Sequence, residues 1–298
     1  GALPDAQPAA MPAELTQASG VYGSTTSVMV ADIAADGTLT LSVPALLGGG
    51  SQTLTYYSDG SFRDESNSFL IRFVEEDNGN TYLFQKAYTT LPGLPATCTA
   101  EYTHQKLEEN QVSDEVLAAW EARSQKLYLL LDEAWSAQSW LSAMPATTAA
   151  IPEETPGYIV SNRIVDADTA LCEVQIPGTG GRDSADVVFG QENGLEVIYI
   201  KDYRYIESAY AEVISPWRTS YCTIQSSGDA RWYQAGSAAG KTMSVTLEGD
   251  GSFTVYDATG VEVASSLTGS SSVVLPENGW IVFAGDTGTR FHITMDVA

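Results

Sequence analysis

The sequence predicts a mainly β protein, with a small barrel or half-barrel first, a short helical segment next, and further strands that end in a β-sandwich or jelly-roll-like domain. Six Asp-Gly or Asn-Gly pairs punctuate the 298 residues, and such pairs supply the positive φ that tight hairpin turns require. Each pair lies between runs rich in Val, Thr, Tyr, Phe and Ile, which favour strands. Helical spacing of apolar residues appears only after Pro95. The pairs are Asp36-Gly37, Asp59-Gly60, Asn78-Gly79, Asn193-Gly194, Asp250-Gly251 and Asn278-Gly279.

The first β domain is expected over residues 14–112. Its strand-like runs follow one another at short, regular spacing, which is typical of a small barrel whose alternate side chains fill the interior. Residues 1–13 begin without Met and carry no basic or apolar targeting segment, so we expect a disordered or artificial leader there. The predicted strands are 27–33, 39–43, 52–57, 70–73 and 81–86.

A helix and a connecting segment are expected over residues 113–150. Ser113 has the character of an N-cap, and Asp114 and Glu115 follow where a helix N-terminus favours negative charge. The helix is predicted to end near Arg123. The apolar run 126–131 fits a second helical stretch or a buried strand equally well. Three prolines then predict a linker, with a domain boundary near residue 150: Pro145, Pro152 and Pro156.

The second half is predicted to be β throughout, with a second β region over 151–215 and a β-sandwich-like domain over 216–298. Strand-like runs in the former are 157–160, 170–176, 186–189, 195–201 and 203–206. Those in the latter are 242–247, 252–256, 262–265, 272–275, 280–283 and 291–295.

The charge balance excludes nucleic acid as a partner. Fourteen Lys and Arg residues face 38 Asp and Glu residues, for a net charge of −24, and no basic run occurs anywhere. Anionic lipid is disfavoured for the same reason. No apolar stretch approaches the roughly 18 residues that a membrane-spanning helix needs. We therefore expect neither a nucleic-acid partner nor a membrane span.

The motifs of common enzymes are missing, so no catalytic residue, metal ligand or cofactor is predicted. None of the five lysines follows a Ser at the Ser-x-x-Lys spacing, and the Gly-x-Ser-x-Gly, phosphate-loop and His-Glu-x-x-His motifs are absent. Cys98, Cys172 and Cys222 are too scattered for a zinc cluster or a disulfide scaffold. At most one bridge can form among them, and we interpret them as buried free thiols in preference to that bridge. The acidic stretch 75–80 is interpreted as a solvated turn in preference to a calcium loop.

Two histidines leave one enzymatic alternative open. His104 and His292 lie far apart in sequence, but a triad is defined by geometry and not by order along the chain. A hydrolase that uses one of them would need a Ser, Thr or Cys in contact with the imidazole. We interpret both as ordinary core or surface residues.

Aromatic side chains after residue 216 supply the only candidate ligand contacts. Trp217, Tyr221 and Trp232 are candidates for a platform that stacks against a sugar or peptide, although such residues more commonly belong to a core. Because neighbouring side chains on a strand point to opposite faces, one of Trp232 and Tyr233 is expected to face a contact surface.

The chain as a whole resembles the non-catalytic C-terminal region of bacterial β-lactamase-related serine hydrolases, namely a lipocalin-like β domain followed by an extended β tail. The resemblance spans about residues 14–297 and rests on short stretches of sequence. In the first half these are Ala18-Ser19-Gly20-Val21-Tyr22-Gly23, Asp36-Gly37-Thr38-Leu39-Thr40-Leu41 and Ser58-Asp59-Gly60-Ser61-Phe62. In the second half they are Gly157-Tyr158-Ile159-Val160, Ile176-Pro177-Gly178, Gly181-Arg182-Asp183 with Asp186, Ala230-Arg231-Trp232-Tyr233, Phe253-Thr254-Val255-Tyr256-Asp257 and Val282-Phe283-Ala284-Gly285-Asp286.

The resemblance implies a function without catalysis in this chain. The catalytic Ser-x-x-Lys, Tyr-x-Asn and Lys-Thr-Gly elements of such hydrolases have no counterpart, the nearest being Lys241-Thr242-Met243. What it implies is an accessory region, extracellular or associated with a bacterial cell envelope, that shapes active-site access, assembly or envelope contact for an upstream catalytic domain of the same polypeptide. The alternative is a stand-alone cell-surface module that binds glycan or peptide.

Overall fold

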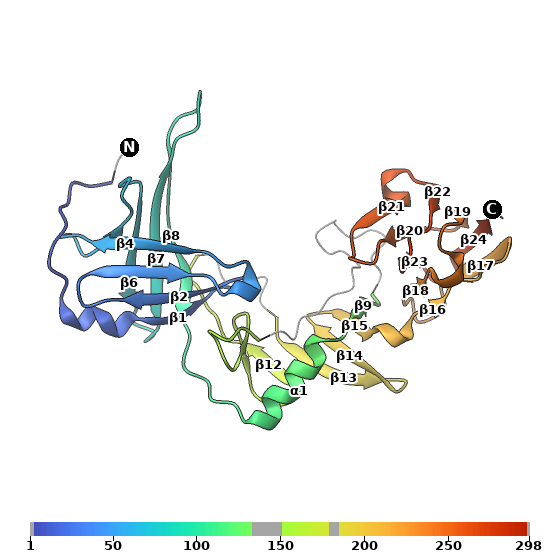
Figure 1. The fold of residues 1–298 in the computed structure, drawn as a ribbon, viewed down its shortest axis with the longest axis horizontal. Helices are drawn as coiled ribbons and strands as arrows, with labels where there is room; N and C mark the ends of the chain where they lie inside the picture. The colour runs from blue at the N-terminus through green and yellow to red at the C-terminus, as the bar shows by residue number, and fades with distance from the viewer. Residues whose placement is uncertain (1–2, 133–150, 179–184, 297–298) are drawn as a thin grey trace. The chain divides into compact units, whose positions relative to one another are not determined.

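The computed structural model describes residues 3–132, 151–178 and 185–296, and it is mainly β, as predicted (Figure 1). The chain forms two compact units. The first contains Gly1–Arg123 and Ala149–Val187, and the second contains Ser124–Thr148 and Val188–Ala298. Short 3₁₀ helices connect some of the strands: η1 (Ala13–Ala18), η2 (Ala45–Leu47), η3 (Ser208–Tyr210), η4 (Gly236–Ala238) and η5 (Ser266–Thr268).

The first unit begins with a closed barrel of eight antiparallel strands. Each strand pairs with the next along the chain, and the last closes the barrel on the first through Tyr22↔Lys106 and Gly23↔Gln105. The prediction of a barrel or half-barrel is thus confirmed in its closed form. The strands are β1 (Gly20–Gly23), β2 (Val28–Ile33), β3 (Thr38–Ser42), β4 (Ser51–Tyr56), β5 (Phe62–Arg63), β6 (Phe69–Glu75), β7 (Thr81–Thr89) and β8 (Thr97–Lys106).

Alternate side chains of the barrel strands fill its interior. On β3, Leu39 and Leu41 are buried while their neighbours are half-exposed, which is the two-residue period of a strand with one face inward. Aromatic rings complete the packing, with Phe62 lying edge-on to Tyr56 at 5.4 Å between ring centroids. The acidic stretch 75–80 forms the β6–β7 turn, where the Gly79 N–H donates to the Glu76 carbonyl.

Residues 3–13, which were expected to be a disordered or artificial leader, are ordered and pack against the barrel, so the prediction of disorder is wrong for them. Leu3 is only 4% exposed, and the carbonyl of Pro4 accepts a 2.8 Å hydrogen bond from Arg63. Pro8 forms an antiparallel bridge with Tyr57. The order of this segment could not be predicted from the sequence, because the segment lacks the alternation of a strand and is held to the barrel by individual contacts.

The predicted helix is confirmed as α1 (Asp114–Ser124), and it belongs to the first unit. Ser113 caps it by accepting a hydrogen bond from the Val116 N–H. Trp120 is fully buried and its indole N–H donates to the carbonyl of Asp166, while Arg123 forms an ion pair with Asp168. Three short strands complete this unit: β10 (Tyr158–Ile159), β11 (Asn162–Ile164) and β12 (Thr169–Cys172).

These contacts explain why the predicted boundaries differ from the observed ones. Residues 151–187 join the barrel and α1 in the first unit, whereas the sequence grouped them with the residues up to 215. The hydroxyl of Tyr82 on β7 donates to the carbonyl of Gln175, and the Gln175 N–H donates to the side chain of Gln105 on β8. The linker predicted around Pro145 lies outside the described residues.

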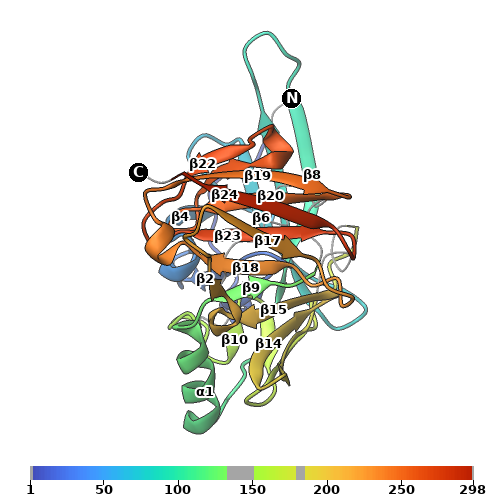
Figure 2. The ribbon, with the colours of Figure 1, turned by 90° about the vertical axis from the view of Figure 1, so that its right-hand side faces the viewer.

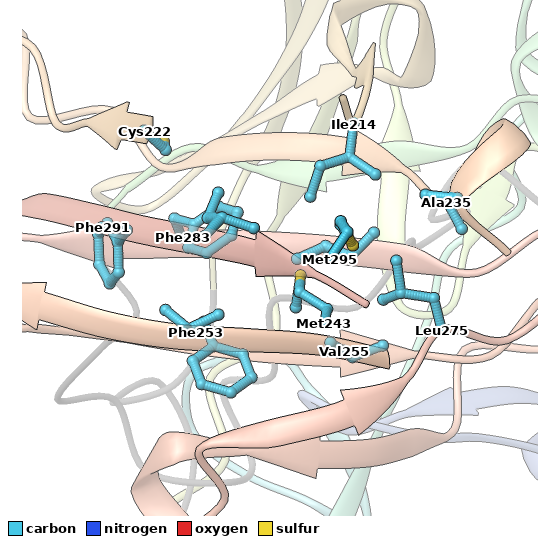
Figure 3. Close-up of a cluster of buried hydrophobic side chains, with 14 of the residues drawn as sticks. Ile214, Cys222, Ala235, Met243, Phe253, Val255, Leu275, Phe283, Phe291 and Met295 are labelled. Atoms are coloured by element: carbon cyan, nitrogen blue, oxygen red, sulfur yellow. The ribbon is translucent and has the colours of Figure 1, made fainter. Parts of the chain in front are cut away.

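The second unit contains the predicted β-sandwich, and Figure 2 shows several of its strands. One sheet has the order β16 (Glu212–Val213), β18 (Arg231–Gln234), β23 (Trp280–Gly285), β20 (Gly251–Tyr256) and β21 (Glu262–Ser265). The other has the order β17 (Thr219–Thr223), β24 (Arg290–Met295), β19 (Thr242–Glu248) and β22 (Ser272–Val274). We call them the five-stranded and four-stranded sheets. Between them lies a core that includes Phe253, Phe283 and Phe291 (Figure 3).

A third layer covers the other face of the five-stranded sheet. It consists of β13 (Val187–Glu192), β14 (Leu195–Ile200), β15 (Tyr203–Glu207) and β9 (Tyr128–Leu130), so the ambiguous run 126–131 contains a buried strand. Leu130, Val197 and Ile206 of this layer pack with Trp232 and Val282 of the five-stranded sheet. That sheet is therefore buried on both faces, and all six residues of β23 are buried.

All three cysteines are free thiols in different environments. Cys222 is buried, as expected, whereas Cys172 is half-buried and Cys98 is exposed on β8. Among the described residues, no helix is long and apolar enough to cross a membrane.

Candidate functional site

The outer face of the four-stranded sheet carries Tyr221, one of the three aromatic candidates, and Trp217 lies just before its strand β17. Along β24, Phe291 and Ile293 are buried in the sandwich core, so Arg290 and His292 lie on the opposite, outer face. Tyr221 of β17 is directly opposite His292 in the ladder, and Thr246 of β19 flanks His292 on its other side. The alternation of apolar and polar residues thus builds this face locally, while strand pairing brings together residues about 70 positions apart.

Three side chains form a stacked column on this face. The guanidinium carbon of Arg290 lies 4.0 Å from the centroid of the Tyr221 ring. The rings of Tyr221 and His292 are stacked, with centroids 4.9 Å apart and an interplanar angle of 12°. A cation over an exposed aromatic ring contributes about 0.5–1 kcal/mol, so the column favours this orientation of Tyr221, a residue that is 54% exposed. We call Arg290, Tyr221 and His292 the aromatic column.

Trp217 extends the aromatic surface beyond the end of β17. It is 74% exposed, and the ladder continues past β17 through the hydrogen bond from the Met295 N–H to the Arg218 carbonyl. Trp217 lies in a bend two residues before β17, four positions from Tyr221 along the chain.

Hydroxyl groups surround the column. Thr219 and Thr223 on β17, Thr294 on β24 and Ser244 on β19 occupy outward positions by the same alternation. Arg290 takes part in no ion pair among the described residues, although Glu248 is its cross-strand neighbour in the ladder. The Nε2 atom of His292 is buried and has no hydrogen-bond partner. The face combines ring surfaces, hydroxyls and one cation, and it offers hydrogen-bond donors and acceptors to a polar ligand.

Trp232, the third aromatic candidate, is not on this face and is not accessible to a ligand. It is 1% exposed, and its indole N–H donates a 2.7 Å hydrogen bond to the carbonyl of Leu130. Its neighbour Tyr233 packs against the sandwich core on the other side of the sheet. The expectation that one of the two faces a contact surface is wrong, because β18 lies in the middle of three layers.

The described structure brings one histidine into contact with a hydroxyl. Nε2 of His104 and Oγ of Ser27 are 2.9 Å apart, and Oγ of Ser27 is also 2.9 Å from that of Ser24. Burial lowers the pKa of His104 to about 4, so the imidazole is neutral near pH 7. Its Nδ1 is buried without any partner, so no acidic group orients the ring as a triad requires. Ser27 and His104 therefore make the contact between hydroxyl and imidazole that the hydrolase alternative needs. Among the described residues, no acidic side chain completes a triad with them.

The sequence analysis predicted Tyr221 and Trp217 as ligand contacts but did not include Arg290. His292 was a candidate only as a catalytic base. The signal for both lay in the alternation of β24, where each precedes a buried apolar residue. Among the described residues, no group of three or more His, Cys, Asp and Glu side chains is placed to hold a metal ion.

Comparison with known proteins adds no relative. No protein family, curated protein or solved structure matches the chain.

Proposed function

We propose that the chain is a non-catalytic binding module that holds a glycan of the cell envelope on the outer face of its four-stranded sheet. The observation that carries the proposal is the aromatic column, with the exposed Trp217 four positions before Tyr221 in the sequence. Exposed rings that gather on one surface mark a binding site more often than rings exposed singly. Sugars present C–H faces that stack on aromatic rings and hydroxyls that bond to Thr, Ser and Arg side chains.

Charge also favours a glycan over a nucleic acid. The chain carries a net charge of −24, and the cation on this face, Arg290, is placed for a local contact and does not belong to a basic patch. The Thr and Ser hydroxyls of the face are neutral donors and acceptors, which suits a ligand rich in hydroxyls.

The test is a binding assay with purified peptidoglycan and a glycan array. We expect the wild-type chain to be retained, and Trp217→Ala and Tyr221→Ala each to weaken retention about tenfold or more, because truncated aromatic contacts dominate such interfaces. Tyr88→Ala, on the barrel strand β7, is the matched control and should bind like the wild type. Equal retention of all four proteins would disprove a role for this face, and retention by a peptide array alone would replace glycan with peptide.

A second candidate is the accessory role within a longer, exported serine hydrolase of the β-lactamase-related class. It is supported by the closed barrel, because the segments that carry the resemblance supply its β1 strand and its β2–β3 and β4–β5 turns. This role is compatible with glycan binding, since envelope contact is one task of an accessory region. The isolated chain is expected not to hydrolyse nitrocefin or p-nitrophenyl esters. Turnover that is lost in Ser27→Ala would overturn the non-catalytic assignment in favour of the Ser27–His104 pair.

A further inference from the structure

The strand register of the four-stranded sheet aligns four hydroxyl-bearing residues across its outer face. Thr294 of β24 lies opposite Thr219 of β17 on one side and opposite Ser244 of β19 on the other. Ser244 in turn lies opposite Ser272 of β22, so each of the four strands contributes one residue (Figure 2). We call Thr219, Thr294, Ser244 and Ser272 the hydroxyl row, and it runs across the strands.

The side chains of the hydroxyl row point away from the sandwich core. Their neighbours along the strands, Met243, Val273 and Ile293, pack in or against that core. Successive side chains on a strand point to opposite faces and residues directly opposite one another share a face, so the row faces outward. Within the described part of the chain, the hydroxyls of the row make one hydrogen bond, at 3.5 Å from Thr294 to the carbonyl of Ser244. The row therefore has donors and acceptors left for a ligand.

The spacing of the row matches the repeat of an extended sugar chain. Neighbouring strands of a sheet lie about 4.7–4.9 Å apart, so the four residues are evenly spaced and span about 14 Å. A glycan whose rings are joined by β-1,4 bonds is a flat ribbon that advances by a similar distance at each ring. Successive rings of such a ribbon would each meet one member of the row. An α-1,4-linked chain coils instead and loses this register within a few rings.

The aromatic column borders the hydroxyl row. Tyr221 lies two residues after Thr219 on β17. His292 lies two residues before Thr294 on β24, and Thr246 continues this second line onto β19. Neither line includes a carboxylate, although the chain has 38 acidic residues. A surface without local negative charge suits an uncharged polymer, and the rings beside the row offer it apolar contact.

From these observations we propose that the face binds a linear β-1,4-linked glycan that lies along the hydroxyl row and crosses the four strands. The inference rests on the proposed glycan-binding function and adds the linkage, the direction and the length of the ligand. Because each strand contributes one member of the row, a segment of about four rings fills it. Chains of N-acetylglucosamine and chains of glucose both have this form, and the test distinguishes them.

The test is isothermal titration calorimetry of the full chain with defined oligosaccharides. The ligands are the dimer, tetramer and hexamer of β-1,4-linked N-acetylglucosamine, the same three lengths of β-1,4-linked glucose, and the hexamer of α-1,4-linked glucose. In the tighter β-linked series, we expect affinity to rise about tenfold or more from dimer to tetramer and to change less than about twofold from tetramer to hexamer. The α-linked hexamer should bind at least about tenfold more weakly than the β-linked hexamer of that series. Equal affinity for dimer and hexamer, equal affinity for the two linkages, or no binding in either β-linked series would overturn the proposal.

A matched pair of double variants tests the row itself. Thr219→Val with Thr294→Val removes two hydroxyls of the row but keeps the branched shape that favours a strand. We expect it to weaken binding of the tetramer about fivefold to tenfold. Thr40→Val with Thr53→Val is the control, because these residues form a cross-strand pair on the barrel with the same exposure, one half-buried and one exposed. The control should bind like the wild type, and thermal unfolding should show that both double variants remain folded.

Tyr221→Ala separates this inference from the proposed function. If Tyr221→Ala weakens retention on peptidoglycan but the double variant of the row binds the oligosaccharides like the wild type, the inference fails and the glycan-binding function stands. If neither protein differs from the wild type, both proposals fail. Equal weakening by the row variant and by the barrel control would also overturn the inference.

Discussion

The carboxylate of Asp59 accepts a 2.7 Å hydrogen bond from the guanidinium of Arg63, whose side chain is fully buried. Arg72 donates to the same carboxylate oxygen at 3.0 Å, and Ser61 to the other oxygen. A buried cation is tolerated only when partners compensate its loss of water. This relationship at the β4–β5 turn explains how an arginine side chain can be fully buried there, with the carbonyl of Pro4 as a further acceptor.

Asp59→Asn is expected to destabilise the first unit by about 3 kcal/mol, because it leaves the Arg63 charge buried without its main partner. Urea unfolding at pH 7, followed by circular dichroism, measures the change. Glu65→Gln, an exposed carboxyl of the same barrel, is the control and should change stability by less than about 0.5 kcal/mol. A loss for Asp59→Asn no larger than that of the control would contradict the assignment.

The same pair predicts a loss of stability in acid. Burial raises the pKa of Asp59, but hydrogen bonds from Ser61 and Arg63 outweigh this and hold the pKa well below its ordinary value. Because the folded-state pKa is lowered, the contribution is complete above about pH 4, the ordinary value, and is lost as pH falls further. The destabilisation caused by Asp59→Asn should therefore shrink between pH 4 and pH 2. An unchanged difference from the wild type over that range would refute this prediction.

His104 predicts a separate change at milder pH. Burial lowers its pKa from 6.5 to about 4, so the unfolded chain takes up a proton in this range and the folded chain does not. Stability must fall as pH decreases from about 6.5 to 4, by up to about 3 kcal/mol. His104→Gln should flatten the pH profile in that window, and NMR should show one imidazole that titrates near pH 4. His292→Gln is the control, and an equal effect of both variants would argue against burial as the cause.

Gly157 and Gly93 form a matched pair that isolates a close contact. Both have positive φ, +89° and +80°, so an alanine is strained at either position. At Gly93 a Cβ would meet nothing within 4 Å, whereas at Gly157 it would lie 2.4 Å from the Asn110 carbonyl oxygen. Gly157→Ala should therefore cost about 1–3 kcal/mol more than Gly93→Ala in urea unfolding. Equal costs would mean that the chain segments at Gly157 and Asn110 can move apart.

Trp217 and Trp232 of the second unit should differ sharply in their effect on stability. Trp232→Ala removes a fully buried ring and leaves the carbonyl of Leu130 unpaired, which is expected to cost about 3–5 kcal/mol. Trp217→Ala changes an exposed side chain and should stay within about 0.5 kcal/mol. Thermal unfolding of both variants measures the contrast. A large loss for Trp217→Ala would place it in the fold and not in a binding surface.

Local signals in the sequence located many of the strands and turns, but they missed others, including β1, β8 and β17. Asp36-Gly37 and Asp59-Gly60 lie at the β2–β3 and β4–β5 turns, and Gly37 and Gly60 both have positive φ. Asn193-Gly194 lies at the β13–β14 turn, where both residues have positive φ. Such turns depend on two residues, and the alternation of the adjoining strands then sets which side chains face inward.

Layering and distant pairing could not be predicted in the same way. Trp232 is buried by a layer that includes Leu130, 102 positions earlier in the chain, and nothing near residue 232 signals that cover. The aromatic column forms because β17 and β24 are neighbours, which alternation within each strand does not specify. For the same reason the sequence analysis wrongly predicted Trp232 as part of a ligand-stacking platform and did not identify Arg290.

Because the five-stranded sheet is buried on both faces, β23 and β24 should differ in which of their positions tolerate polar residues. Every side chain of β23, from Trp280 to Gly285, is enclosed, whereas in β24 only alternate residues are. In a saturation mutagenesis library selected for correct folding, polar codons should be depleted at six consecutive positions in β23 and at every second position in β24. The pattern of tolerated substitutions would thereby show that β23 is covered on both faces and β24 on one.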